Sequence, residues 1–92
     1  MAVRVGILGD FNPDFCSHHA TNDALQHSAA QLGMQVEARW LPTPSLLDPS
    51  GERAMEACDG LWASPGSPYA SFAGMLRGIE FARTWNWPFV GT

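Results

Sequence analysis

The stretch Val3-Arg4-Val5-Gly6-Ile7-Leu8-Gly9-Asp10 decides the fold class of this chain. It begins as a β-branched and apolar run and ends at Gly9-Asp10, which is typical of a buried parallel strand that leads into a loop. The following segment predicts an amphipathic helix that is capped near Ser17 and stopped by Gly33. Six small or apolar residues at helical spacing form its expected inner face: Ala20, Ala24, Leu25, Ser28, Ala29 and Leu32.

Strand and helix signals continue to alternate in the middle of the chain. Residues 35–40, Gln-Val-Glu-Ala-Arg-Trp, alternate polar and apolar side chains. This pattern predicts a strand with one covered face, near the edge of the sheet. Residues 42–51 are rich in turn-forming residues and are expected to be irregular. A short helix is expected over residues 52–58.

The last third of the chain completes the pattern. Residues 61–63 predict a short buried strand, residues 72–84 a helix and residues 87–90 a final strand. Strands alternating with helices predict a three-layer α/β/α fold with a flavodoxin-like parallel sheet. Since loops that follow parallel strands lie along one edge of such a sheet, residues 9–17, residues 64–69 and the segment after Thr92 are expected to lie near one another.

The composition narrows the classes of function. A length of 92 residues, with 46% hydrophobic and 15% charged residues, suits one small domain or part of a larger one. The net charge is −4 and the five Arg residues are scattered, so no nucleic-acid partner is expected. No apolar run approaches the roughly 20 residues of a membrane helix, so no membrane partner is expected. Two isolated thiols and the lack of a signal peptide favour a reduced, cytoplasmic protein.

The first candidate for chemistry is the segment Ser64-Pro65-Gly66-Ser67-Pro68-Tyr69, between a strand and a helix. Gly66 allows the backbone to approach a ligand closely, and N–H groups in such a loop can point at developing negative charge. The flanking Pro residues hold the loop in a fixed shape, as preorganised donors require. A plain strand-to-helix turn is the competing interpretation.

A second candidate is Cys16 with His18 and His19, which could bind a metal or form a thiolate–imidazole pair. Adjacent side chains leave a helix about 100° apart, so at most one of the two His faces a shared centre. His27 lies two turns further along and supplies no second ligand pair. The favoured interpretation is therefore a set of exposed residues at the end of a helix, with no metal site.

Two acids after the first strand raise a third possibility. Asp10 and Asp14 could form a phosphoacceptor pocket, but the tip of the third strand, where the acceptor Asp is expected, has Ala63-Ser64-Pro65. Residues 9–13 also lack the Gly spacing of a phosphate-binding loop, and their acid repels phosphate. A flavodoxin-like cofactor domain is a weaker alternative still, so no cofactor is expected.

Five stretches in compatible spacing point to a known family. They are Arg4-Val5-Gly6-Ile7-Leu8-Gly9-Asp10-Phe11, Asp23-Ala24-Leu25-Gln26-His27, Asp59-Gly60-Leu61-Trp62 ahead of Pro65-Gly66, Gly78-Ile79-Glu80-Phe81-Ala82-Arg83 and Pro88-Phe89-Val90-Gly91. In this order they resemble the amidotransferase domain of CTP synthase, which is a class I glutamine amidotransferase. The resemblance covers nearly the whole chain.

The resemblance implies what the chain contributes and what lies outside it. In that family the strand that matches residues 88–91 leads into a Cys nucleophile, and a His and a Glu follow much later, so the triad is expected beyond residue 92. Residues 1–92 would then be the amino-terminal half of a single domain with an incomplete sheet, and the carboxyl-terminal half is the expected partner. Gly66 would lend its backbone N–H to the oxyanion hole. The expected substrate-binding residues are Pro65, Ser67, Pro68 and Tyr69.

The implied activity is hydrolysis of an amide, glutamine or a related compound, through a Cys thioester. The CTP synthase loop continues with a second Gly and then Phe-Gly, whereas this chain has Ser67-Pro68-Tyr69, and Pro68 has no N–H to offer. The first strand begins almost at Met1, which suggests a stand-alone relative without the synthetase domain. A non-catalytic relative that binds a ligand or partner is the alternative. By itself the chain is expected to form a homo-oligomer through its last strand.

Overall fold

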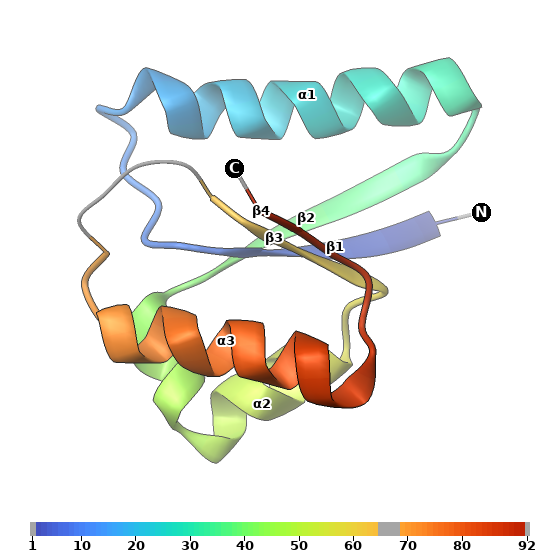
Figure 1. Cartoon of the computed structure of the whole chain (residues 1–92). Helices are drawn as coiled ribbons and strands as arrows, with labels where there is room; N and C mark the ends of the chain where they lie inside the picture. The colour runs from blue at the N-terminus through green and yellow to red at the C-terminus, as the bar shows by residue number, and fades with distance from the viewer. Residues whose placement is uncertain (1, 65–68, 92) are drawn as a thin grey trace.

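In the computed structural model, which describes residues 2–64 and 69–91, four parallel strands form one sheet in the order β2-β1-β3-β4. The strands are β1 (Ala2–Leu8), β2 (Gln35–Leu41), β3 (Gly60–Ala63) and β4 (Phe89–Gly91). Helices lie on both faces of this sheet (Figure 1). The predicted α/β class with a parallel sheet and helices on both sides is confirmed, and the sheet is a partial one.

The two faces are covered unequally. Helix α1 (Cys16–Leu32) lies on one face, where it packs mainly against β2. The short 3₁₀ helix η1 (Thr43–Leu47), α2 (Pro49–Glu56) and α3 (Phe72–Trp85) lie on the other face (Figure 1). The main core is on this second side, where aliphatic and aromatic side chains from the sheet and the three helices are buried together. They include Leu8, Leu46, Met55, Met75 and Phe81.

Helix α1 has the predicted extent but a different start and a rotated inner face. It begins at Cys16, and no side chain caps it, so the predicted cap at Ser17 is wrong. Its buried residues are His18, Thr21 and Ala29. The predicted inner residues Ala20, Ala24, Ser28 and Leu32 are exposed, and Leu25 is half-buried. The rotation follows from the polar contacts of the helix, because Asn22 accepts a hydrogen bond from the indole N–H of Trp40 in β2.

The segment after β2 is more regular than its composition predicts. Residues 43–47 form η1, and α2 starts at Pro49, three residues before the predicted start of that helix. Both helices carry Pro in the first turn, where the missing N–H would have no helical partner. Pro therefore opens these helices instead of breaking the chain into a loop. Gly51 permits the close packing, since a Cβ there would overlap the carbonyl of Ser45.

Helix α3 and strand β4 are the last two elements of the described chain. Asn86, in the left-handed conformation with φ of 56°, stops the helix, and Trp87 then donates its backbone N–H to the carbonyl of Ala82. β4 starts two residues later than the predicted strand 87–90. None of the helices within residues 2–64 and 69–91 combines the length and the apolar character that crossing a lipid bilayer requires.

Candidate functional site

The carboxyl ends of three strands meet at one edge of the sheet. The parallel register pairs Leu8 of β1 with Ala63 of β3, and Ala63 in turn with Gly91 of β4. Gly9, Ser64 and the end of β4 at Gly91 therefore lie at neighbouring points of this edge. This is the edge at which α/β sheets of this kind bind ligands.

The predicted site residues follow β3 in the sequence, and one of the five is described. Pro65, Gly66, Ser67 and Pro68 lie outside the described residues. Tyr69 is described, and its phenol O–H donates to the carbonyl oxygen of Ser64 at 2.8 Å.

Asp10 organises the edge in a way that sequence reasoning missed. Its Oδ1 accepts the backbone N–H of Thr43 at 2.9 Å. Its Oδ2 accepts both the hydroxyl of Thr43 at 2.8 Å and the backbone N–H of Ala70 at 2.9 Å. Asp10 thus joins the ends of β1 and β2 to the start of α3, and no phosphoacceptor role is needed to explain it.

The network continues into α3. The buried hydroxyl of Thr43 also accepts the backbone N–H of Ser71 at 2.8 Å. The Ser71 hydroxyl then caps the helix by accepting the N–H of Gly74 at 3.0 Å. A side-chain cap of this kind typically stabilises a helix by about 1 kcal/mol. The start of α3 is consequently fixed to β1 through two side chains.

Gly9 and Ser64 pack directly against each other at the tips of β1 and β3. A Cβ at position 9 would overlap the Ser64 hydroxyl, so only Gly allows this approach. Ser64 donates its backbone N–H to the carbonyl of Leu8 at 3.0 Å. Its side chain is 1% exposed, and its Oγ has no hydrogen-bond partner among the described residues.

The Cys and His residues in the first turn of α1 do not form a metal site. Cys16 and His19 are exposed, as predicted, but His18 is only 3% exposed and that part of the prediction is wrong. His18 accepts the backbone N–H of Asn12 at its Nδ1, 2.9 Å away. Its ring lies 4.7 Å from the ring of Trp40, centroid to centroid. Over the described residues, no group of three or more His, Cys, Asp or Glu side chains is placed to hold a metal ion.

His18 is part of an aromatic cluster that supports the loop after β1. Phe11 and Phe15 both pack against the His18 ring, at centroid distances of 5.9 and 5.1 Å, and Phe11 also contacts Trp40. The three large aromatic residues of this cluster, Phe11, Phe15 and Trp40, can be read directly from the sequence. His18 and Trp40 are 22 positions apart, and the sequence gives no local signal that they meet.

The other thiol lies away from this edge. Cys58 is buried just before β3, at the opposite end of the strands. Burial raises the pKa of the Cys58 thiol above its usual value. Because the thiolate is the reactive form, Cys58 is poorly suited to act as a nucleophile.

Similarity to known proteins agrees with this geometry. No protein-family model matches the chain. CTP synthase of Encephalitozoon cuniculi is 33% identical over 89 residues, which cover 97% of this chain. CTP synthase of Haloquadratum walsbyi is 29% identical over 90 residues, or 98% of the chain. The chain is CTP synthase-like. It spans 16% of the length of each of these relatives.

A solved structure supports the fold of this CTP synthase-like chain. The glutaminase domain of Trypanosoma brucei CTPS, solved with bound acivicin, superimposes with a TM-score of 0.83 at 20% identity. The match covers 97% of this chain and 35% of that one. The resemblance to CTP synthase predicted from the sequence is confirmed by these relatives, and this structure confirms the fold.

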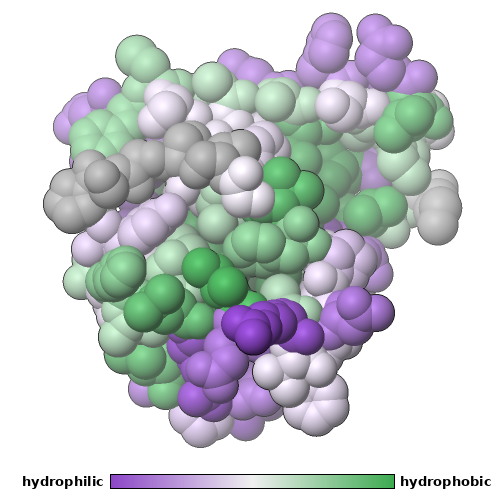
Figure 2. Space-filling view, in the orientation of Figure 1, coloured by the Kyte–Doolittle hydropathy of each residue, from purple (hydrophilic) through white to green (hydrophobic). Residues whose placement is uncertain are grey.

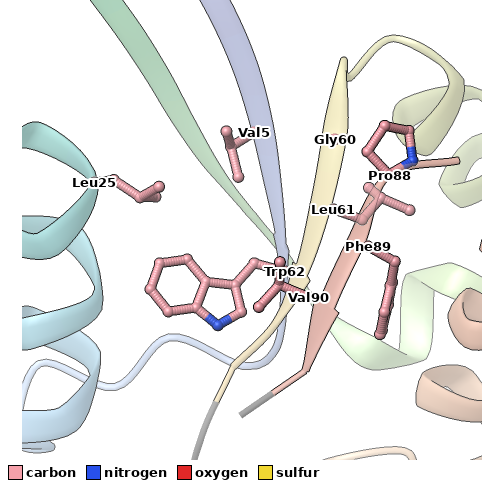
Figure 3. A pocket seen from close by; sticks show the side chains of 8 residues that line it. All are labelled: Val5, Leu25, Gly60, Leu61, Trp62, Pro88, Phe89 and Val90. Atoms are coloured by element: carbon pink, nitrogen blue, oxygen red, sulfur yellow. The ribbon is translucent and has the colours of Figure 1, made fainter. Parts of the chain in front are cut away.

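The CTP synthase-like sheet has an apolar groove on the face that carries α1. Since α1 packs mainly on β2, the part of this face formed by β3 and β4 is left open. The groove has a volume of about 310 Å³. Figure 3 shows Trp62 projecting from β3 toward Leu25 of α1. The remaining lining residues are Val5, Gly60, Leu61, Pro88, Phe89 and Val90.

Apolar side chains are also exposed on the opposite side. Phe72, Leu76 and Ile79 of α3 are 63%, 51% and 39% exposed. They follow one another at helical spacing, and the helix buries its other face through Met75 and Phe81. Green patches in Figure 2 mark apolar surface on the face that the view presents. The CTP synthase-like chain thus leaves apolar surface uncovered on both sides of its sheet.

Proposed function

We propose that this chain forms the oxyanion-hole side of a CTP synthase-like site that hydrolyses glutamine or a related amide. The observation that carries the proposal is the register of β3 and β4, in which Ala63 lies beside Gly91. The loop that contains Gly66 therefore begins next to the point at which the chain leaves β4. This adjacency supports the proposal that a nucleophile directly after β4 and an N–H donor on this loop act on one carbonyl group.

In the proposed reaction, a Cys directly after Thr92 attacks the amide carbonyl carbon, and a C–S bond forms. A His takes the thiol proton and delivers it to the departing nitrogen, so that ammonia leaves as the C–N bond breaks. Water then hydrolyses the thioester and returns the free thiol. The His and a Glu that orients it belong to the segment beyond residue 92, so residues 1–92 are the amino-terminal half of the domain.

Gly66 is proposed to donate its backbone N–H to the oxyanion of the tetrahedral intermediate. Loss of one such donor typically costs about 3 kcal/mol of transition-state stabilisation. Pro65, Ser67, Pro68 and Tyr69 are proposed to shape the substrate pocket around it. Pro68 leaves one N–H fewer than the CTP synthase loop provides, which is why a relative of glutamine stays a candidate substrate.

The proposed partner is the carboxyl-terminal half of the same domain. The apolar groove over β3 and β4 and the exposed residues of α3 support this assignment, because apolar patches of this kind usually contact protein. β4 supports it as well, since Val90 in this edge strand is 57% exposed. A second copy of the chain is the alternative occupant of the same surface.

Ammonia release tests the proposal. The protein carrying the residues that follow Thr92 is incubated with glutamine and, separately, with asparagine. We expect ammonia from glutamine or from a close analogue, and we expect the Cys16→Ser variant to be as active as the unaltered protein. Ligand binding without ammonia release would instead favour the non-catalytic alternative. Loss of activity in Cys16→Ser would contradict the placement of the nucleophile.

A further inference from the structure

The loop that contains Gly66 is held at both flanks by contacts of described residues. On the β3 side, Ser64 is fixed by its N–H bond to Leu8 and by the phenol of Tyr69, which donates to the Ser64 carbonyl. On the α3 side, the backbone N–H groups of Ala70 and Ser71 are bonded to side-chain oxygens of Asp10 and Thr43. The β3 flank is thus held by a backbone bond and by the Tyr69 phenol, whereas the N–H groups of the α3 flank are held by the side chains of Asp10 and Thr43.

Asp10 is suited to this task by its charge and its geometry. Three donors from two segments point at its two oxygens, all at 2.8 to 2.9 Å. Hydrogen bonds to an ionised acceptor are roughly twice as strong as neutral ones. Among the described residues no Arg forms an ion pair with Asp10, and the donors that reach its carboxylate are these neutral groups. An amide in its place would turn an NH₂ group toward at least one of the donors.

Thr43 connects Asp10 to Ser71, the second residue of the α3 flank. Its side chain is completely buried, and its hydroxyl donates to Asp10 while it accepts the N–H of Ser71. The direction of the first bond leaves the hydroxyl lone pairs free to accept the second. Removal of the hydroxyl would take away the acceptor of the Ser71 N–H and one of the two donors to Oδ2 of Asp10.

We propose that Asp10 is a positioning residue for the amide-hydrolysing site, and that it acts with Thr43 by fixing Ala70 and Ser71. The inference rests on the function proposed above. Asp10 touches no substrate in this scheme. It fixes the backbone of Ala70 and Ser71, and these residues follow the segment that contains the proposed oxyanion donor, Gly66. A displacement of about 1 Å in such a group can lower a rate about 100-fold.

Activity of the Asp10→Asn variant tests the inference in the protein carrying the residues after Thr92. We expect kcat for amide hydrolysis to fall about 10- to 100-fold while KM changes less than about threefold, because the oxyanion contact exists only in the transition state. Asp14→Asn is the matched control. The Asp14 side chain is exposed in the same loop and accepts no hydrogen bond from any described residue. A kcat for Asp10→Asn within twofold of that of the control overturns the inference.

Amide hydrogen exchange gives a readout that does not need activity. In Asp10→Asn and Thr43→Val we expect the amides of Ala70 and Ser71 to exchange at least about tenfold faster, since local opening becomes easier. Thr43→Ser keeps the hydroxyl and should keep the slow exchange. Unchanged exchange in Asp10→Asn overturns the positioning role, even in an active protein. Absence of amide hydrolysis by the unaltered protein rejects the proposed function itself, and the inference with it.

Discussion

At Gly74, α3 packs directly against the backbone of η1. A Cβ at this position would overlap the carbonyl oxygen of Thr43, which belongs to the backbone and cannot rotate away. The same Thr43 carries the hydroxyl that joins Asp10 to Ser71. The absence of a side chain at Gly74 is thus a condition for the hydrogen-bond network at the candidate site.

Replacement of Gly74 by Ala should destabilise the protein by about 1–3 kcal/mol, the usual cost of overpacking a close contact. Helix propensity alone would give the opposite sign, since Ala is favoured over Gly inside a helix by up to about 1 kcal/mol. Urea unfolding followed by circular dichroism measures the difference. Gly60→Ala is the control, because its Cβ would lie 3.7 Å from Pro88, an ordinary contact. Equal stabilities of the two variants would contradict this account of Gly74.

At the residue scale, the sequence revealed local patterns but not contacts between distant residues. The Pro65-Gly66 loop stood out because Pro and Gly leave a local pattern, although the role of Gly66 stays a prediction. Asp10 and Thr43 left none, because they meet across 33 positions of sequence. His18 was assigned to the surface for the same reason. Its aromatic neighbour Trp40 comes from another element, and no periodicity within the helix reveals that contact.

At the scale of single elements, periodicity predicted the strands and long helices but not always their buried faces. α3 was expected from Phe72, Leu76, Ile79, Phe81 and Ala82. Phe81 and Ala82 are buried together with Gly74, Met75 and Gly78, whereas the first three residues are exposed. Small residues allow close packing without adding to an apolar pattern. An apolar stripe that faces away from the core is also what a helix shows when a further part of the domain covers it.

β4 is the strand through which we expect copies of this chain to associate. It forms an edge of the sheet, and Val90 is both exposed and part of the apolar groove. Edge strands with apolar side chains pair readily with other chains, and a Lys on such a strand opposes pairing. We therefore expect residues 1–92, prepared by themselves, to sediment as a dimer or larger species, and Val90→Lys to sediment as a smaller one.

Analytical ultracentrifugation checks this expectation. Ala20→Lys adds the same charge at an exposed position of α1, away from the groove, and should leave the self-association of the chain unchanged. A monomer for the unaltered chain at micromolar concentration would contradict the assignment of β4 as an association edge.

For the whole molecule, the parallel order β2-β1-β3-β4 gathers the ends of β1, β3 and β4 at one edge, as the alternation of strands and helices predicted. Topology could be predicted because crossover connections in such folds have one hand. The unequal cover of the two sheet faces could not be predicted, because it depends on which side chains α1 uses to pack on β2. The central claim is that this edge supplies one half of an amide-hydrolysing site whose nucleophile follows β4.

The most direct test is to locate a covalent adduct. The protein carrying the residues after Thr92 is treated with a chloroketone analogue of glutamine, and peptide mass spectrometry identifies the alkylated residue. The account predicts one adduct, on a Cys directly after Thr92, with Cys16 and the buried Cys58 unlabelled. Excess glutamine should protect the site from labelling. No adduct, or an adduct on Cys16 or Cys58 that glutamine does not protect, would contradict it.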